Sequence, residues 1–255
     1  MTSTAFYLLK PDALTCGTVA QRARELAPNL HVVAEQDVVI TSQQVSALWA
    51  DNRSELYPIA SAFLKLYLVG QTSRLVTVHG ETALEDVIGL KQQLRREYGR
   101  GAFANVVHAP SDPRENEDHA AVLEGRSRPP RSGPVYPPAS SRVVSLGQDE
   151  IFHVVSAIWK QAHEFGWPSL AAPPSNAPAA VWLIADHVHS IDSAVSALWE
   201  GLPQLSLHTA VALVCEVERT GRTPVLSGTP AVVAHAARRL RALGLQIETG
   251  PSTAG

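Results

Sequence analysis

Apolar and polar positions along the first part of the chain alternate in ways that predict a series of strands and helices. Short apolar or alternating runs predict strands at Thr4–Leu9, His31–Ile40, Arg74–His79 and Ala102–Val107. Apolar residues at helical spacing predict helices at Val19–Leu26, 42–50 and Thr82–Gln93. The predicted order begins as βαβ and continues with further helices and strands.

A capping signal and the order of elements together predict the fold class. Thr41 and Gln44 fit a capping box, in which a hydroxyl and an amide satisfy exposed backbone N–H groups at a helix start. Strands that alternate with helices favour a sheet covered by helices on one face. We therefore predict an α/β (α+β) fold, with a ferredoxin-like βαββαβ sandwich over residues 1–124.

The C-terminal part of the chain shows a second set of periodic segments. Residues 149–164 carry an apolar stripe at helical spacing, which is more typical of packing than of ligand binding. Further on, strands are predicted at 181–185, 223–226 and 245–248, and helices at 192–200, 206–219 and 230–242. Gly244 stands where a helix C-cap glycine is expected. These elements predict a second small α/β domain over residues 181–250.

Two proline-rich segments mark the predicted domain boundaries. Residues 125–142 read GRSRPPRSGPVYPPASSR, where prolines fix φ and remove backbone donors, so residues 125–148 are predicted to be a linker. Residues 149–180 are predicted to be a helix followed by a proline-rich connector. Arg126, Arg128 and Arg131 make the linker basic, which leaves open an acidic partner besides a solvated tether.

Composition limits the classes of function. Among the 255 residues, 45% are hydrophobic and 18% charged, which suits globular domains with buried cores. The net charge of -3 provides no basic surplus for binding nucleic acid. The two cysteines, Cys16 and Cys215, suit a reducing compartment, so a cytoplasmic protein is predicted. No segment has the apolar length of a membrane span or the pattern of a signal peptide, so no membrane role is expected.

Motifs at both ends of the first domain carry a resemblance. Lys10-Pro11-Asp12 closes the first strand, Gly17 follows in the next turn, and Asn105-Val106-Val107-His108-Ala109-Pro110-Ser111-Asp112 closes the last strand. In this order, over residues 4–124, they resemble the KPD strand and the NVIHGSD active-site segment of nucleoside diphosphate kinases. The chain departs from that family by the inserted Pro110 and by a shorter segment before Arg95 that lacks a second phosphate-binding arginine.

The resemblance implies phosphoryl transfer through a phosphohistidine. His108 would be the catalytic nucleophile in a ping-pong reaction between two nucleotides. Lys10 and Arg95 would bind the phosphates, and Asn105 would bond the sugar hydroxyl. Mg²⁺ would arrive with ATP or another nucleoside triphosphate, so no protein metal site is expected. The resemblance also implies a homo-oligomer.

Other family positions have less certain counterparts. The aromatic residue that stacks on the base would be Tyr57 or Phe63, and the active-site tyrosine of the family would correspond to Trp49 or to no residue. The glutamate that orients the histidine has no obvious match, although Glu115 and Glu117 are near in sequence. A histidine that merely ends a strand is the alternative interpretation of His108.

Residues 181–249 resemble the Clp protease adaptor ClpS. The resemblance includes a strand that ends in an acidic turn, the V-x-x-x-G-R turn at Val217–Arg222 and the closing helix. It implies a protein-interaction module that contacts a protein client or the Clp machinery. Asp186 and Glu218 would attract an amino group. His187 and His189 form an H-x-H pair, but no third metal ligand stands at a recognisable spacing.

Two hypotheses therefore stand at the level of the sequence. In the first, the protein is an enzyme, a nucleotide-dependent phosphotransferase of nucleoside diphosphate kinase type fused to a protein-binding module. In the second, a catalytically degenerate nucleotide-binding domain belongs to a ClpS-like adaptor or regulatory protein. Phosphate on His108 would discriminate between them.

Overall fold

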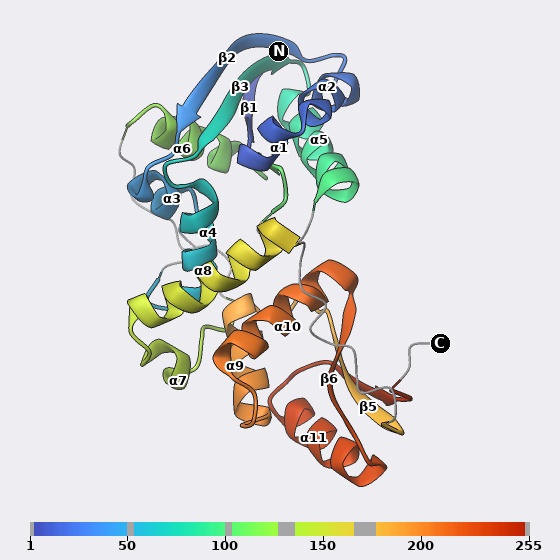
Figure 1. Ribbon diagram of the computed structural model, residues 1–255. Coiled ribbons are helices and arrows are strands. Elements are labelled where there is room, and N and C mark those ends of the chain that lie inside the picture. The colour runs from blue at the N-terminus through green and yellow to red at the C-terminus, as the bar shows by residue number, and fades with distance from the viewer. Residues whose placement is uncertain (1–2, 50–53, 100–103, 127–135, 166–176, 253–255) are drawn as a thin grey trace. The chain divides into compact units, whose positions relative to one another are not determined.

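The chain forms two compact units in the computed structural model, which describes residues 3–49, 54–99, 104–126, 136–165 and 177–252 (Figure 1). The first unit comprises Met1–Asp51 and Leu64–Gly133, and the second comprises Asn52–Phe63 and Pro134–Gly255. A segment inside the predicted first domain, residues 54–63, thus belongs with the C-terminal unit. Among the described residues, no helix is both long enough and apolar enough to cross a bilayer.

The first unit contains a four-stranded antiparallel sheet in the order β2-β3-β1-β4. Its strands are β1 (Ser3–Leu9), β2 (His31–Val39), β3 (Thr72–Gly80) and β4 (Val107–His108). Its helices are α1 (Pro11–Thr15), α2 (Gly17–Leu26), α3 (Ser42–Leu48), α5 (Ala83–Tyr98) and α6 (Pro113–Leu123), and α4 (Pro58–Leu68) contributes its C-terminal part. This mixed α/β architecture with an antiparallel sheet is consistent with the predicted ferredoxin-like sandwich.

Helices cover both faces of this sheet, whereas the sequence predicted them on one face. Ala5, Tyr7 and Leu9 alternate along β1 and pack in one core with residues of α2 and α5. On the other face, α6 adjoins β1, where the Asn116 side-chain amide donates to the Thr4 carbonyl at 3.0 Å. Helix α6 was not predicted from the sequence.

The capping box at Thr41 is confirmed, but the predicted strand at Ala102–Val107 was wrong in extent. The Thr41 hydroxyl accepts from the Gln44 N–H, and the Gln44 side-chain oxygen accepts from the Thr41 N–H. Helix α3 begins at Ser42, directly after Thr41. Only Val107 and His108 form β4, and residues 101–103 lie outside the described part of the chain. Val106 has a φ of 55°, which breaks the extended backbone before His108.

The second unit contains a three-stranded antiparallel sheet in the order β6-β5-β7. Its strands are β5 (Ala179–Ile184), β6 (Arg222–Gly228) and β7 (Ile247–Gly250). Its helices are α7 (Ser141–Val144), α8 (Gln148–Phe165), α9 (Ile191–Gly201), α10 (Leu207–Thr220) and α11 (Pro230–Ala242). Each strand and helix predicted from residue 149 onward is present, and Gly244 takes a φ of 91° after α11.

The segment predicted as a linker is partly structured. Residues 127–135 lie outside the described part of the chain, but α7 falls within the predicted range of 125–148. Val143 on α7 is fully buried, and the Ser140 N–H donates to the hydroxyl of Ser196 on α9 at 2.9 Å. Residues 139–144 therefore belong to the packed part of the second unit.

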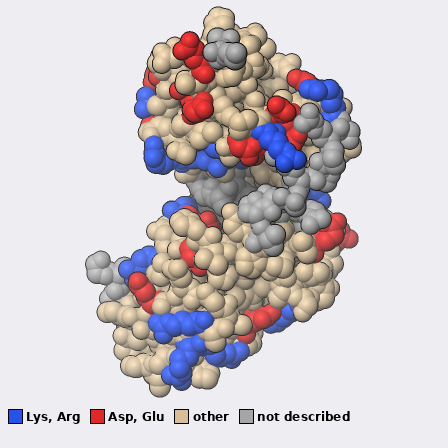
Figure 2. All heavy atoms as spheres, turned by 180° about the vertical axis from the view of Figure 1, so that it is seen from behind, with Lys and Arg blue, Asp and Glu red and all other residues tan. Residues whose placement is uncertain are grey.

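Acidic and basic side chains are interspersed on the face shown in Figure 2.

Candidate phosphohistidine site

His108 is placed by a short strand and by an unusual backbone turn. It lies in β4 opposite Leu8 of β1, and its side chain is buried. Just before it, the Val107 N–H donates to the Asn105 carbonyl at 2.6 Å, and the Val106 carbonyl accepts from Lys10 N–H at 2.8 Å. A β-branched residue at positive φ is rare, and such strain is concentrated at functional sites. The turn fixes His108 directly beside the end of β1.

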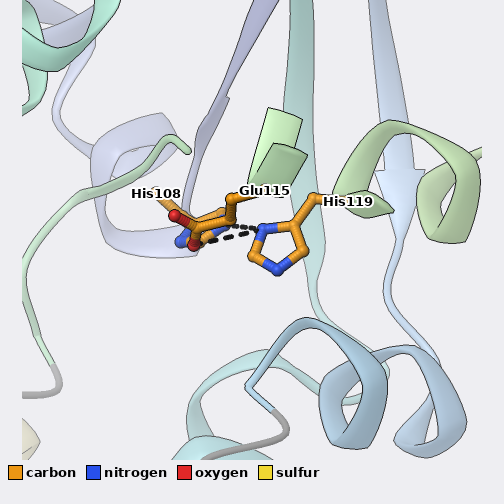
Figure 3. A group of neighbouring side chains, drawn as sticks. All are labelled: His108, Glu115 and His119. Carbon is orange, nitrogen blue, oxygen red and sulfur yellow. Dashed lines mark hydrogen bonds and ion pairs between the residues drawn. The ribbon is translucent and has the colours of Figure 1, made fainter. Parts of the chain in front are cut away.

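A second histidine holds the ring of His108. Nε2 of His108 lies 3.0 Å from Nδ1 of His119 on α6, and both residues are buried (Figure 3). Glu115, one helical turn before His119, places Oε1 3.6 Å from the same Nδ1. Between two facing ring nitrogens, one must carry the proton and the other must accept it. His119 thus occupies the orienting position that the sequence left without a match, and Glu115 stands beside it.

Lys10 is buried next to the histidine pair. Its side chain is 2% exposed, and Nζ donates to Asn105 Oδ1 at 2.5 Å. Nζ also lies 5.5 Å from the ring centroid of Trp49 and 5.1 Å from that of Tyr67, within range of cation–π attraction. Burial, followed by the charge of Arg95, lowers the pKa of Lys10 to about 7. The predicted pair Lys10 and Asn105 is brought together.

Arg95 and Lys91 approach the same segment from α5. Arg95 donates through Nε and Nη2 to the carbonyl of Val107, at 3.3 and 3.1 Å. Lys91 is buried and donates to the Ala109 carbonyl and the Ser111 hydroxyl, both at 2.8 Å, and to the Pro110 carbonyl at 3.3 Å. Because an ammonium has only three donors, Lys91 is fully used in holding the loop that contains the inserted proline. Sequence reasoning missed Lys91.

The environment of His108 favours its neutral form. Burial lowers the pKa of His108 well below its usual value, and the neighbouring His119 and the cations Lys10, Arg95 and Lys91 lower it further. The ring of Trp49 packs against that of His108 with centroids 4.8 Å apart. A neutral imidazole keeps a lone pair on one nitrogen, as a nucleophile requires.

Two predicted aromatic residues belong to the second unit. Tyr57 belongs to the second unit, where it is buried and its hydroxyl donates to the Tyr136 carbonyl at 2.5 Å. Phe63 belongs there too, and its ring lies 6.3 Å from that of Trp159. Within the first unit, the ring of Trp49 reaches His108. Glu117 is exposed on α6.

In the second unit, the predicted ligand residues form part of a turn. Asp186 Oδ1 accepts from the backbone N–H groups of Val188 and His189, both at 2.9 Å, and Oδ2 lies 3.0 Å from Nδ1 of His189. Glu218 is exposed, and partial desolvation and the charge of Asp186 raise its pKa. The two carboxylates are thus near enough to interact, but Asp186 is already engaged within its own loop. His187 is exposed.

Comparisons with known proteins concern the first half of the chain. No protein-family model matches the chain, and none of the curated proteins matches it. Among solved structures, the nucleoside diphosphate kinase of Aquifex aeolicus is similar at 14% identity, over 48% of this chain and 95% of that chain, with a TM-score of 0.41. The enzyme of Halobacterium salinarum in complex with CDP is similar at 18% identity, over 48% and 88%, with a TM-score of 0.42. That of Encephalitozoon cuniculi is similar at 20% identity, over 51% and 93%, with a TM-score of 0.40. These structure neighbours are nucleoside diphosphate kinases that match the N-terminal part, and the ClpS-like character of the second unit stays a prediction.

Proposed function

We propose that the first unit is a nucleotide-dependent phosphotransferase in which His108 accepts the γ-phosphoryl group of a nucleoside triphosphate. The observation that carries this proposal is a buried imidazole, hydrogen-bonded to His119, with Lys10, Lys91 and Arg95 near it. Lys10 and Arg95 are near enough to lower the pKa of His108, and they would attract phosphate oxygens for the same reason. A histidine that merely ended a strand would not require this costly arrangement of like charges.

The hydrogen bond to His119 occupies Nε2 of His108, which leaves Nδ1 as the nitrogen outside the pair. In the reactive tautomer that we propose, His108 carries its proton on Nε2, donates to His119 Nδ1 and keeps a lone pair on its own Nδ1. Nδ1 would attack the γ-phosphorus, the bond from that phosphorus to the bridging oxygen would break, and the nucleoside diphosphate would leave with the bond electrons. Transfer from phosphohistidine to a second nucleoside diphosphate reverses these steps and restores His108.

Nucleotide binding requires an exchange of contacts at the site. Lys10 would exchange its bond to Asn105 for phosphate oxygens, which frees the Asn105 amide for the sugar hydroxyl. Arg95 would turn from the Val107 carbonyl towards the phosphates. Mg²⁺ would be carried on the phosphates of the incoming nucleotide. Trp49 lies against His108, so we assign to it, rather than to Tyr57, the aromatic contact with the nucleotide.

The alternative is a catalytically degenerate nucleotide-binding domain. It is favoured by how completely the site is occupied by its own side chains, since His108 is only 5% exposed and Lys91 is saturated by the loop. In that case the second unit would supply the function, as a ClpS-like adaptor that binds a protein client or the Clp machinery. Asp186 and Glu218 would then attract a substrate amino group.

We also propose that the protein forms a homo-oligomer through the free edge of its first sheet. β2 is the terminal strand in the order β2-β3-β1-β4, and its residues are almost all exposed. Val33 and Val39 are 53% and 59% exposed on it. An apolar strand edge with unpaired backbone groups is a template for pairing with another chain.

Incubation with ATP labelled on the γ-phosphate, in the presence of Mg²⁺, tests the proposed activity. We expect acid-labile label on the wild-type chain and on His31→Ala, an exposed control, and none on His108→Ala. Label that survives His108→Ala would refute the assigned nucleophile. Nucleotide binding without any label on the wild-type chain would establish the degenerate alternative instead.

A further inference from the structure

The geometry points to a divalent transition-metal site formed by His108, Glu115 and His119, which regulates the nucleophile. The site was not expected from the sequence, where Mg²⁺ was predicted only with the nucleotide. The metal binding itself is independent of the proposed phosphotransfer, and its regulatory effect rests on that proposed function. The donor set contains two imidazoles and one carboxylate, the combination found in catalytic zinc sites and in non-haem iron sites.

The three donor groups already converge on one point. One ligand atom from each residue lies within 4.8 Å of the others, and the two facing ring nitrogens are 3.0 Å apart (Figure 3). Nitrogens bound at about 2.0–2.1 Å to a tetrahedral zinc ion are roughly 3.4 Å from each other. Small rotations of the two rings are therefore enough to admit an ion in place of the shared proton.

The backbone around the site holds Glu115 in place. Its Oε2 accepts from the Ser111 N–H at 2.6 Å, which leaves Oε1 directed at His119. Asp112 caps α6 by accepting from the Glu115 N–H at 2.7 Å, so the helix that carries two of the three donors begins at a fixed point. Outer contacts of this kind orient metal ligands in proteins.

The donors and their surroundings select the class of metal. Imidazole nitrogens suit Zn²⁺ and related transition metals, whereas Mg²⁺ and Ca²⁺ prefer oxygen ligands. Three protein donors leave a fourth position open. The nearby cations Lys10, Lys91 and Arg95 oppose a dication, and this repulsion weakens the site relative to a permanent structural zinc site. An exchangeable ion, suited to regulation, is the result.

A bound metal would lock His108 in an unreactive tautomer. Metal coordination through Nε2 replaces the proton that this nitrogen gives to His119, so the ring proton of neutral His108 moves to Nδ1. Protonated Nδ1 has no lone pair for phosphorus. The metal on Nε2 of His108 would therefore prevent phosphorylation of Nδ1, although the two groups bind different nitrogens of the ring.

Titration of the chelator-treated full chain with Co²⁺, without nucleotide, tests the site. We expect one equivalent to bind with the intense visible absorption of a low-coordinate cobalt ion, and Zn²⁺ to abolish that absorption. Glu115→Gln and His119→Asn should weaken binding by more than the about 10–100-fold typical of losing an outer contact. The matched controls Glu117→Gln, on the same helix, and His31→Asn should bind as the wild type does. Equal affinity in Glu115→Gln and Glu117→Gln, or no visible band, would overturn the site.

Labelling of the same preparations with Mg²⁺ and ATP tests the regulation. Zn²⁺ should suppress the label on His108 in the wild type and in Glu117→Gln, and should suppress it far less in Glu115→Gln. Wild-type chain that binds Zn²⁺ and labels equally well with and without it would overturn the tautomer lock. A chain that binds cobalt but is never labelled, even when metal-free, would overturn the proposed phosphotransfer and leave the metal site standing.

Discussion

His108 in the first unit is buried among other ionisable side chains, whereas Asp192 in the second unit is buried against backbone N–H groups. After burial, the charge of Arg95 lowers the pKa of Lys10, and the charges of Lys10 and Arg95 lower the pKa of His108. Asp192 of α9 is fully buried too, but its two oxygens accept from the backbone N–H groups of Ile59 and Ala60, at 2.8 and 3.0 Å. Asp192 thus serves the start of α4.

The difference teaches how to separate a site from a structural contact. When a carboxylate accepts from the free N–H groups at a helix start, these hydrogen bonds offset the free-energy cost of burying it. Like charges buried together gain nothing for the fold, and such clusters mark functional sites. Asp186 and His189 resemble Glu115 and His119 in residue type. Asp186, however, accepts hydrogen bonds from the backbone of its own turn, whereas the pair Glu115 and His119 faces His108.

The largest effect is expected from removing the buried cation. Lys10→Met deletes the charge and the donor beside His108, and should lower the rate of phosphohistidine formation by about 10²–10³-fold, the usual cost of losing one positioned donor. Single-turnover labelling measures this rate, with Lys65→Met as the matched control. A loss of less than tenfold, on the order of one weak contact, would mean that Lys10 does not serve the phosphates.

Removing the buried carboxylate of the second unit should affect stability instead. Asp192→Ala leaves the N–H groups of Ile59 and Ala60 buried without their acceptor, and should cost about 2–3 kcal/mol in free energy of unfolding. Asp192→Asn keeps one acceptor and should cost less. Chemical denaturation measures both values. Unchanged unfolding of Asp192→Ala would show that this contact does not secure the helix.

The two groups should give opposite dependences of stability on pH. Desolvation raises the pKa of Asp192 to about 7, so the unfolded chain ionises first, and stability through this group falls as pH rises from about 4 to 7. The lowered pKa of Lys10, about 7, has the reverse effect, because the unfolded chain then binds the additional proton. Stability through Lys10 therefore rises as pH increases from about 7 to 10.

Denaturation of variants across this range separates the two contributions. Asp192→Asn should flatten the acid side of the stability profile alone, and Lys10→Met the alkaline side alone. If both variants kept the wild-type profile, neither buried group would titrate as the structure implies.

The smallest effect is expected at the loop of Asp186. Asp186→Ala removes the acceptor for the N–H groups of Val188 and His189, and should cost about 1 kcal/mol, as the loss of a cap does. Labelling of His108 should remain at the wild-type rate. Denaturation measures the stability of Asp186→Ala, and labelling of the same preparation measures the reactivity of His108. Impaired labelling would contradict the distinction between a structural contact at Asp186 and a functional site at His108.

The sequence predicted those features that local signals or motifs carry. The capping box at Thr41 and the glycine after α11 depend on neighbouring residues, so their positions could be predicted directly. Lys10, Asn105 and His108 were found through ordered motifs, and the structure brings them together. The elements of the second unit followed from clear periodicity.

The sequence could not show contacts that depend on how separate helices meet a strand. His119 and Lys91 read as ordinary positions on α6 and α5, and only packing turns them towards β4. The pairing of one acid and one histidine a turn apart was the signal available for His119. The positive φ of Val106 could not be predicted, because β-branched residues rarely adopt this left-handed conformation. Residues 54–63, which include Tyr57, join the second unit, a division that no local signal indicates.

The central claim is that His119 holds Nε2 of His108 and leaves Nδ1 to take the phosphoryl group. Phosphorus NMR of the metal-free chain, denatured in alkali after reaction with Mg²⁺ and ATP, distinguishes phosphate on the two ring nitrogens. We predict a single phosphohistidine signal from the Nδ1 isomer, absent from His108→Ala. A signal from the Nε2 isomer, or none from a chain that binds the nucleotide, would contradict the account.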